Sequence, residues 1–251
     1  MINIILSGCF GKMGRVITHC VSSRTDCQIV AGVDIFDGQA DFPVYKSFMD
    51  IKESGDVIID FSHPSTLSSL LRYALSKKCA CVIATTGLSE EQIDSIHTAS
   101  NEIPIFFAAN MSIGVALVAE LAAKAAKVLE GSFDIEVVEM HHNQKIDAPS
   151  GTALMLANTI SDALSEKPHY EFDRHSKRAK RDPHEIGIHA LRGGTVVGEH
   201  EVIFAGLDEV IKISHSARSK ELFAVGALNA ALFLHNQPPK LYGMKELIAD
   251  K

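Results

Sequence analysis

Two histidines and a lysine lie close together near the middle of the chain, at positions that predict acid–base chemistry. A β-branched and apolar stretch, Glu136 to Met140, predicts a strand that delivers His141 and His142 at its end, and Lys145 follows. An imidazole, whose unperturbed pKa is about 6.5, can give or take a proton near neutral pH. We therefore expect His141 to transfer a proton.

The segment after Lys145 predicts the start of a helix that can bind an anion. Pro149 suits the first helical turn because its missing N–H would be unpaired there in any case. Gly151 and Thr152 follow as small residues whose backbone amides would lie at the helix start, and the amino end of a helix attracts negative charge. A negatively charged ligand could therefore contact His142, Lys145 and the amides of Gly151 and Thr152 together.

The same residues, taken one at a time, have simpler interpretations. The histidine pair could be ordinary surface or two metal ligands, but adjacent strand residues point to opposite faces and make a poor chelate. No H-E-x-x-H motif or cysteine cluster accompanies the pair, so a metal is not expected. Lys145 alone would be a solvated lysine, and the helix start alone an ordinary cap. Only the combination at this spacing predicts a site.

The amino-terminal segment has the pattern of a dinucleotide-binding fold. An apolar run, Ile2 to Ser7, leads into a G-x-x-G-x-x-G turn that begins at Gly8 and continues into a helix. A second strand, Gln28 to Val33, ends at Asp34, where such a fold places the acid that binds the ribose. The spacing departs from G-x-G-x-x-G because Phe10 occupies the middle position.

The residues around this turn leave the choice of cofactor open. Asp34 would accept a hydrogen bond from a 2′-hydroxyl and repel a 2′-phosphate, and the next residue is Ile35 rather than an arginine. This favours NAD. Lys12 and Arg15, at the start of the first helix, could still attract a 2′-phosphate, so the use of both cofactors is a second hypothesis.

Three further strands predict a doubly wound parallel sheet with its ligand edge at the strand ends. They are Val57 to Phe61, Ala80 to Ala84 and Ile103 to Phe107. Ligands of such sheets bind outside the carboxyl ends of the strands. The residues expected around the cofactor are therefore Phe61, Ala84, Thr85, Thr86, Ala108, Ala109, Asn110 and Met111.

The pattern changes after Met111, where we place a domain boundary. An Ala-rich helix, Gly114 to Leu129, precedes the histidine segment, and the region from Glu185 to His215 reads as antiparallel strands. These strands are predicted at 186–191, 195–205 and 209–214. The expected domains are 1–111 with about 219–251, and 112–218, with a helix over Lys220 to Leu234 returning to the first domain.

Composition limits the class of protein. The chain has 251 residues, is 46% hydrophobic and carries a formal net charge of -7, which argues against generic nucleic-acid binding. No apolar run reaches the ~18 residues of a membrane span, and the start lacks a basic region, so we expect the cytoplasm. The five cysteines, at 9, 20, 27, 79 and 81, are expected to be buried reduced thiols.

One basic segment, Arg174 to Arg181, stands out from this acidic background. Its expected role is a solvated loop or helix face, and the alternative is a cationic flap near an anionic cofactor.

The histidine segment resembles the signature of the 4-hydroxy-tetrahydrodipicolinate reductase (dihydrodipicolinate reductase) family. The resemblance rests on EVVEMH at 136–141, on Lys145 and Asp147, and on PSGTA at 149–153. The glycine turn is similar to the family's G-x-x-G-[RK]-M-G, and DFSHP, ATTG and AANMS are similar to its cofactor-contacting turns. Gly187, the Arg192 to Gly194 segment and the Gly198 to His200 segment resemble the sheet that builds a tetramer in the family.

The resemblance implies a function and a role for each site residue. The reaction would be NADH- or NADPH-dependent reduction of 4-hydroxy-tetrahydrodipicolinate, via dihydrodipicolinate, to tetrahydrodipicolinate in the diaminopimelate and lysine route. His141 would be the catalytic proton donor and acceptor, Lys145 a second proton donor, and His142, Gly151 and Thr152 contacts of the small dicarboxylate substrate. The cofactor contacts of the glycine turn would be Gly8, Cys9, Phe10, Gly11, Lys12 and Met13.

It also implies a Rossmann-like dinucleotide-binding domain, a substrate-binding and oligomerisation domain with a largely antiparallel or mixed open sheet, and a homotetramer. Two rival functions are a metal hydrolase that uses the numerous histidines, and a nicotinamide-nucleotide-sensing protein without turnover.

Overall fold

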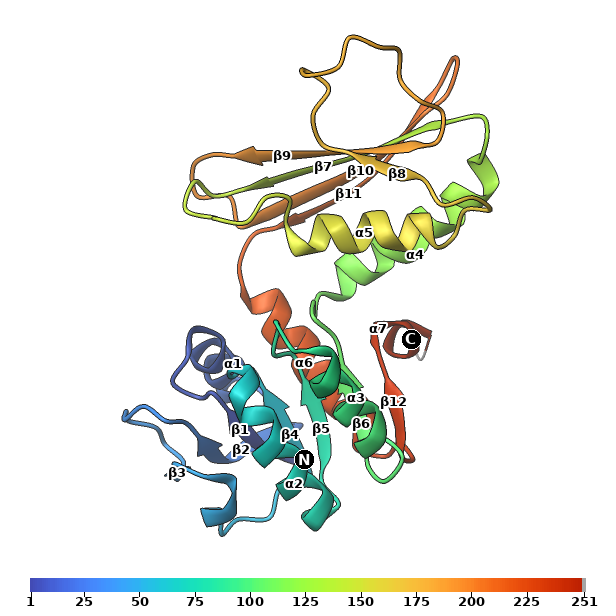
Figure 1. Ribbon diagram of the computed structural model, residues 1–251. Coiled ribbons are helices and arrows are strands. Elements are labelled where there is room, and N and C mark those ends of the chain that lie inside the picture. Colours follow the sequence, from blue (N-terminus) through green and yellow to red (C-terminus); the bar gives the residue numbers. More distant parts are fainter. Residues whose placement is uncertain (250–251) are drawn as a thin grey trace. The chain divides into compact units, whose positions relative to one another are not determined.

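The computed structural model describes residues 1–249, which fold into two compact units (Figure 1). Unit 1 comprises Met1–Ser112 and the segment from Lys220 onwards, and unit 2 comprises Ile113–Ser219. Within the described residues, no helix combines the length and apolar character needed to cross a membrane.

Unit 1 is built on a seven-stranded parallel sheet with the strand order β12-β6-β5-β4-β1-β2-β3. The chain enters at the interior strand β1, extends to one edge through β2 and β3, and then returns to the other side of β1 with β4, which is the doubly wound arrangement. The strands are β1 Ile2–Ser7, β2 Cys27–Val33, β3 Val44–Tyr45, β4 Val57–Asp60, β5 Ala80–Ile83, β6 Pro104–Phe107 and β12 Lys240–Tyr242.

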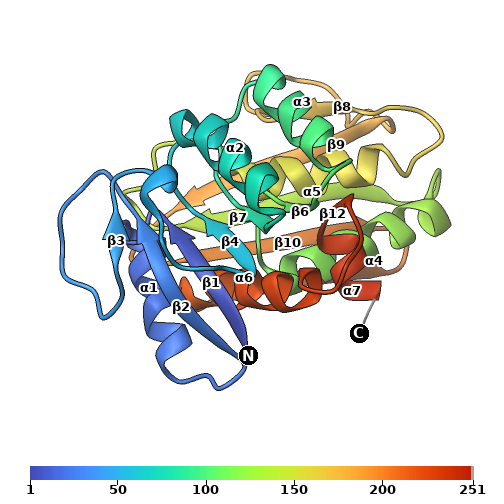
Figure 2. The ribbon, with the colours of Figure 1, turned by 90° about the horizontal axis from the view of Figure 1, so that it is seen from below.

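Helices cover both faces of this sheet, which is why its central strands are apolar along their whole length (Figure 2). Helices α1 and α6 contact each other on one face, and α2 and α3 lie on the other. The helices are α1 Lys12–Ser22, α2 Leu67–Lys77, α3 Glu90–Ala99, α6 Glu221–Leu234 and α7 Met244–Ala249, with short 3-10 turns at Phe48–Asp50 and Pro64–Thr66.

Unit 2 contains a five-stranded mixed sheet in the order β11-β10-β7-β9-β8. Its strands are β7 Asp134–His141, β8 His169–Glu171, β9 Glu185–Arg192, β10 Gly198–Ala205 and β11 Val210–Ala217. Two helices, α4 Ile113–Leu129 and α5 Gly151–Ser161, cover one face and form a core with the side chains that point towards them (Figure 1). Side chains at the strand ends therefore point either towards these two helices or towards the opposite face of the sheet.

The pairing of β9 differs from the expected antiparallel run. Strands β10 and β11 are antiparallel, but β9 does not pair with β10; it lies parallel to β7, which separates the two. Strand β7 is central because it pairs with β10 along one edge, antiparallel, and with β9 along the other, parallel. The fold class, a parallel sheet followed by a mixed sheet, is confirmed.

Element boundaries moved by a few residues, and short elements were missed. Helix α3 begins with a capping box between Ser89 and Gln92. Pro64 opens a 3-10 turn, and helix α2 follows from Leu67. Strands β3, β8 and β12 and helix α7 were not predicted, because two- to six-residue elements carry too little periodic pattern.

Candidate active site

Strand β7 carries two polar residues at the end of an otherwise apolar row. Its burial alternates, so Ile135, Val137, Glu139 and His141 all point towards the helices, while the residues between them point away. Ile135 and Val137 belong to the core, and Glu139 and His141 continue the row beyond it. His141 Nδ1 lies 2.6 Å from Glu139 Oε2. Because an ionised carboxylate can only accept, Nδ1 carries the hydrogen and donates it.

Glu139 is fully buried and has four hydrogen-bond donors around it. Arg192 on β9 binds it with both terminal nitrogens, Nη1 to Oε2 and Nη2 to Oε1, each at 2.9 Å. The backbone N–H of Ser150 donates to Oε1 at 3.0 Å. Burial pushes the pKa of Glu139 upwards, but the hydrogen bonds from Arg192, His141 and Ser150 outweigh it and hold the pKa below its usual value. Glu139 is therefore an anion.

A second buried histidine, His200 on β10, lies against this group. Its ring is 5.2 Å from the His141 ring in an edge-to-face arrangement, and its Nε2 atom lies 3.0 Å from Ser150 Oγ. Ser150 Oγ already accepts the N–H of Ala153 as the cap of α5, so its hydroxyl hydrogen is available to His200. Burial, followed by the charge of His141, lowers the pKa of His200 to about 4. His200 is therefore neutral near pH 7.

The loop after β7 holds Lys145 next to the same cluster. Its Nζ atom forms an ion pair with Asp147 Oδ1 at 2.9 Å, and this hydrogen bond lowers the pKa of Asp147. Arg192 Nη2 donates to the backbone carbonyl of Asp147 at 2.6 Å. One guanidinium thus joins the end of β7 to the loop that carries Lys145.

The predicted anion-binding residues lie where this loop enters α5, with one correction. Ser150, not Pro149, begins the helix as its cap, and Pro149 precedes it. Gly151 and Thr152 are the first two helical residues, which is the position that the anion-binding hypothesis gives them. The buried Nδ1 atom of His142 has no hydrogen-bond partner among the described residues. The structure therefore groups His141, His142, Lys145, Gly151 and Thr152 within one segment of unit 2.

The glycine turn of unit 1 has the close backbone packing of a phosphate cradle. Gly8 has φ +75°, and a Cβ at Gly14 would lie 2.6 Å from the carbonyl oxygen of Cys9 and closer still to that of Gly8. Gly11 is the cap of α1, and its N–H donates to Gly8 at 3.0 Å. The turn therefore excludes side chains at Gly8 and Gly14, which fits a pyrophosphate at the start of α1.

Asp34 is fixed by the same turn. Its Oδ2 atom accepts the N–H of Phe10 at 2.8 Å, and Oδ1 accepts the N–H of Phe36 at 3.0 Å. Each carboxylate oxygen keeps a further lone pair for a ribose hydroxyl. The neighbouring Cys9 is buried, and burial raises the pKa of its thiol to about 11, so it is no nucleophile at neutral pH.

The remaining predicted cofactor residues lie at one edge of the parallel sheet. The register pairs Ser7 with Asp60, Asp60 with Ile83 and Ile83 with Phe107, so the turns after β4, β5 and β6 start at the same level. These turns contain Phe61, then Ala84, Thr85 and Thr86, then Ala108, Ala109, Asn110 and Met111.

Sequence reasoning missed Asp60, which connects two of these turns. It is buried at the end of β4 and accepts the hydroxyls of Ser62 and Thr85, each at 2.6 Å. Burial raises the pKa of Asp60. Asp60 begins the DFSHP segment, but an acidic residue that ends an apolar strand is a local signal that many surface turns share.

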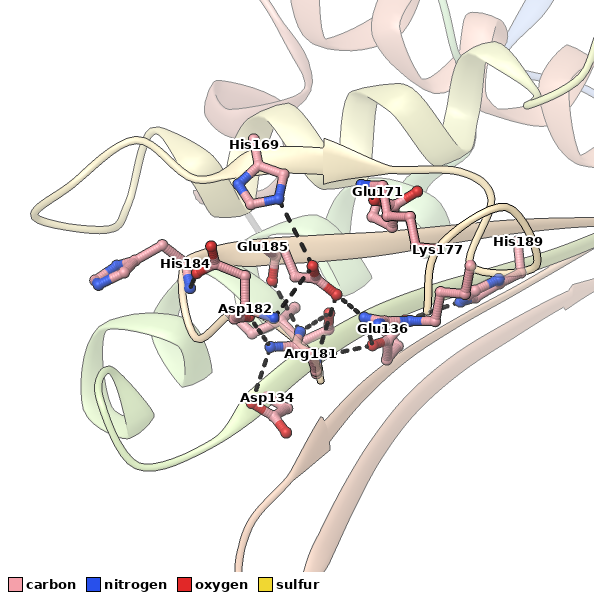
Figure 3. A network of polar contacts seen from close by, with 12 residues as sticks. Asp134, Glu136, His169, Glu171, Lys177, Arg181, Asp182, His184, Glu185 and His189 are labelled. Atoms are coloured by element: carbon pink, nitrogen blue, oxygen red, sulfur yellow. Dashed lines mark hydrogen bonds and ion pairs between the residues drawn. The ribbon is translucent and has the colours of Figure 1, made fainter. Parts of the chain in front are cut away.

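The basic segment is an exposed loop from His175 to Lys180, as expected, although three of its cations form ion pairs. Lys177 pairs with Glu171, and Arg181 pairs with Glu136 (Figure 3). Arg174 pairs with Glu185. The Arg181 guanidinium also donates to the backbone carbonyls of Ile135 and Glu185 at 3.0 and 2.8 Å. The physical reason is that the buried carboxylates of Glu171 on β8 and Glu185 on β9, and the half-buried carboxylate of Glu136 on β7, need countercharges.

His169, Glu171 and Glu185 come close enough to hold a cation, with one ligand atom of each within 4.8 Å of the others. Basic side chains already form ion pairs with these carboxylates. Lys177 pairs with Glu171, and Arg174 and Arg181 pair with Glu185. We therefore interpret this cluster as a set of ion pairs.

Comparison with known proteins gives the same picture along the whole chain. The family model "Dihydrodipicolinate reductase, N-terminus" matches residues 2–111, and "Dihydrodipicolinate reductase, C-terminus" matches residues 114–248. A 4-hydroxy-tetrahydrodipicolinate reductase of Caldanaerobacter subterraneus subsp. tengcongensis is 54% identical over 99% of this chain and 98% of its own length. A Clostridium tetani protein of the same name is 50% identical over 97% and 96%.

A solved structure agrees as well. The dipicolinate-bound dihydrodipicolinate reductase from Paenisporosarcina sp. TG-14 superimposes with a TM-score of 0.80 at 26% identity, covering 98% of this chain and 99% of that one. With two family models that together span nearly every residue, the chain belongs to the dihydrodipicolinate reductase family.

Proposed function

We infer that this protein is a 4-hydroxy-tetrahydrodipicolinate reductase of the diaminopimelate and lysine route. It would use NADH or NADPH to reduce 4-hydroxy-tetrahydrodipicolinate, via dihydrodipicolinate, to tetrahydrodipicolinate. The observation that carries this inference is the arrangement of unit 2, where an imidazole fixed by a buried carboxylate lies beside a lysine and a helix start. These groups suit a substrate with two carboxylates and a carbon that needs a proton.

The chain's own residues would perform binding and proton transfer, while the nicotinamide supplies the hydride. His142, Lys145 and the amides of Gly151 and Thr152 would bind the substrate carboxylates. The Nδ1 atom of His141 is committed to Glu139, so protonation of the electron-rich product of hydride addition falls to Nε2. Lys145 is the second proton donor.

The cofactor would lie against unit 1, across the glycine turn and the three turns at the carboxyl edge of the sheet. We include in the proposal the preference of the protein for NADH over NADPH. Asp34 and Ile35 favour NADH, and Lys12 and Arg15 leave NADPH as a second substrate. We also propose that unit 1 binds the dinucleotide, and that unit 2 binds the substrate and builds a homotetramer.

The decisive experiment mixes the purified protein with NADH, and separately with NADPH, in the presence of the product of dihydrodipicolinate synthase made in situ. Substrate-dependent loss of the nicotinamide absorbance is expected, with NADH the better cofactor. In the same assay, His141→Gln should lower kcat more than it raises KM, whereas Lys145→Ala should damage both. Binding of both cofactors without oxidation would support the nucleotide-sensing alternative, and full turnover by His141→Gln would contradict its role as the acid.

A further inference from the structure

We propose that Glu139, held in place by Arg192, positions His141 for proton transfer. The inference rests on the proposed function, because it concerns how His141 would present its proton. Glu139 has no exposed side-chain surface, so it acts through His141 as a positioning residue.

The hydrogen bonds around Glu139 leave its carboxylate one orientation. Oε2 accepts from His141 Nδ1 at 2.6 Å and from Arg192 Nη1 at 2.9 Å. Oε1 accepts from Arg192 Nη2 at 2.9 Å and from the Ser150 N–H at 3.0 Å. Because the carboxylate cannot donate, this arrangement fixes the hydrogen on Nδ1 of His141 and leaves Nε2 to exchange the proton.

The surroundings of His141 also fix the plane of its ring. A Cβ at Gly198, on the neighbouring strand β10, would lie 3.1 Å from His141 Nε2, so this glycine gives the ring its space. His200 closes another side with its ring edge. The imidazole is therefore held by a hydrogen bond at one nitrogen and by contacts around the other.

Arg192 also helps to position Lys145, the second predicted proton donor. It lies directly opposite His141 in the parallel pairing of β7 and β9, and its Nη2 atom also binds the carbonyl of Asp147. Asp147 in turn pairs with Lys145. The pair Glu139–Arg192 therefore sets the positions of both proposed proton donors relative to the start of α5.

The charge of Glu139 is essential to this arrangement. A glutamine at this position could turn its NH₂ group towards Nδ1, which would favour the tautomer with the hydrogen on Nε2. It would also leave the Arg192 guanidinium without its countercharge. We therefore expect Glu139→Gln to disturb the tautomer of His141 and not only the stability of the fold.

The chain offers a matched control on the same strand. Glu136 also binds a histidine and an arginine, His189 Nε2 at 2.8 Å and Arg181 Nε at 3.1 Å, but on the opposite face of β7 (Figure 3). Glu136→Gln removes the same charge from a similar setting without touching His141. Glu136→Gln therefore shows how much kcat and the His141 signals change when a carboxylate is lost elsewhere in this sheet.

The experiment compares Glu139→Gln and Glu136→Gln in the full-length protein by steady-state kinetics and by ¹⁵N NMR of labelled histidines, with the His141 signals assigned from His141→Gln. Glu139→Gln should lower kcat at least ~10-fold, within the roughly 10²–10⁴-fold that a positioned acid contributes, with little change in KM. The His141 signals should show loss of the single Nδ1–H form. Glu136→Gln should leave both readouts unchanged.

A fall in kcat with unchanged His141 signals, or an equal fall in Glu136→Gln, would overturn the positioning role. Altered signals with full turnover would instead contradict the proton-transfer role of His141, and so the proposed function. If Glu139→Gln does not fold, Arg192→Lys provides the second test, because it removes the two-pronged contact while Glu139 remains. It should lower kcat by a smaller factor and broaden the same His141 signals, and unchanged kinetics would again overturn the inference.

Discussion

Acid should destabilise this protein through His200 specifically, and the structure sets the sign and size of the effect. The pKa of His200 is lowered to about 4 by burial and by the nearby charge of His141, whereas an unfolded histidine has a pKa of about 6.5. The unfolded chain therefore binds more protons between these values. The stabilising contribution of neutral His200 is complete above about pH 6.5 and is lost as the pH falls towards about 4.

The magnitude follows from the difference between the two pKa values. At about 1.4 kcal/mol per pKa unit, full protonation of His200 would lower the free energy of unfolding by about 3 kcal/mol. Between about pH 7.5 and pH 5 the free energy of unfolding should fall by roughly 2 kcal/mol through this residue. His200 is only 5% exposed, so solvent screening reduces this little. The titratable groups around it are His141, Glu139, His215 and Lys145.

The assay is urea unfolding of the wild type and of His200→Gln at both pH values, at one protein concentration because assembly shifts apparent stability. His215, which lies opposite His200 on β11 and whose pKa is also lowered by burial, contributes to both proteins and largely cancels in the difference. The free-energy gap between wild type and variant should narrow by roughly 2 kcal/mol on going to the lower pH. A gap that stays constant would refute the argument from burial.

Two further substitutions test the helix starts on which the site depends. Ser150→Ala removes the cap of α5 and the hydrogen-bond partner of His200 Nε2. The free energy of unfolding, measured by urea denaturation, should therefore fall by about 1–3 kcal/mol. A loss below ~0.5 kcal/mol would contradict a stabilising role for both contacts. Gly14→Ala places a Cβ against the backbone of the glycine turn, so NADH binding measured by calorimetry should weaken at least ~10-fold. Gly11→Ala is the control, because its Cβ would lie 3.2 Å from the Gly8 oxygen, and it should weaken NADH binding less. Equal NADH affinities of the two variants would argue against a cradle formed by close backbone approach.

Local patterns in the sequence determined the fold class and the family. A strand, a glycine turn and an acid after the second strand are adjacent features with fixed spacing, so they predict the doubly wound sheet of unit 1 without tertiary information. The segment from His141 to Thr152 is equally local, and its residues lie together because one strand end, one loop and one helix start connect them. The family inferred from these motifs is confirmed.

Tertiary structure alone decided what surrounds His141. Arg192 reaches Glu139 across 53 residues and His200 reaches Ser150 across 50, because β7 lies between β9 and β10. No spacing in the sequence encodes that strand order. Glu139 did have a local signal, since residues two apart on a strand share a face. Whether that face was buried, and so whether the carboxylate would be held as an anion beside the imidazole, depended on the helices and strands that cover it.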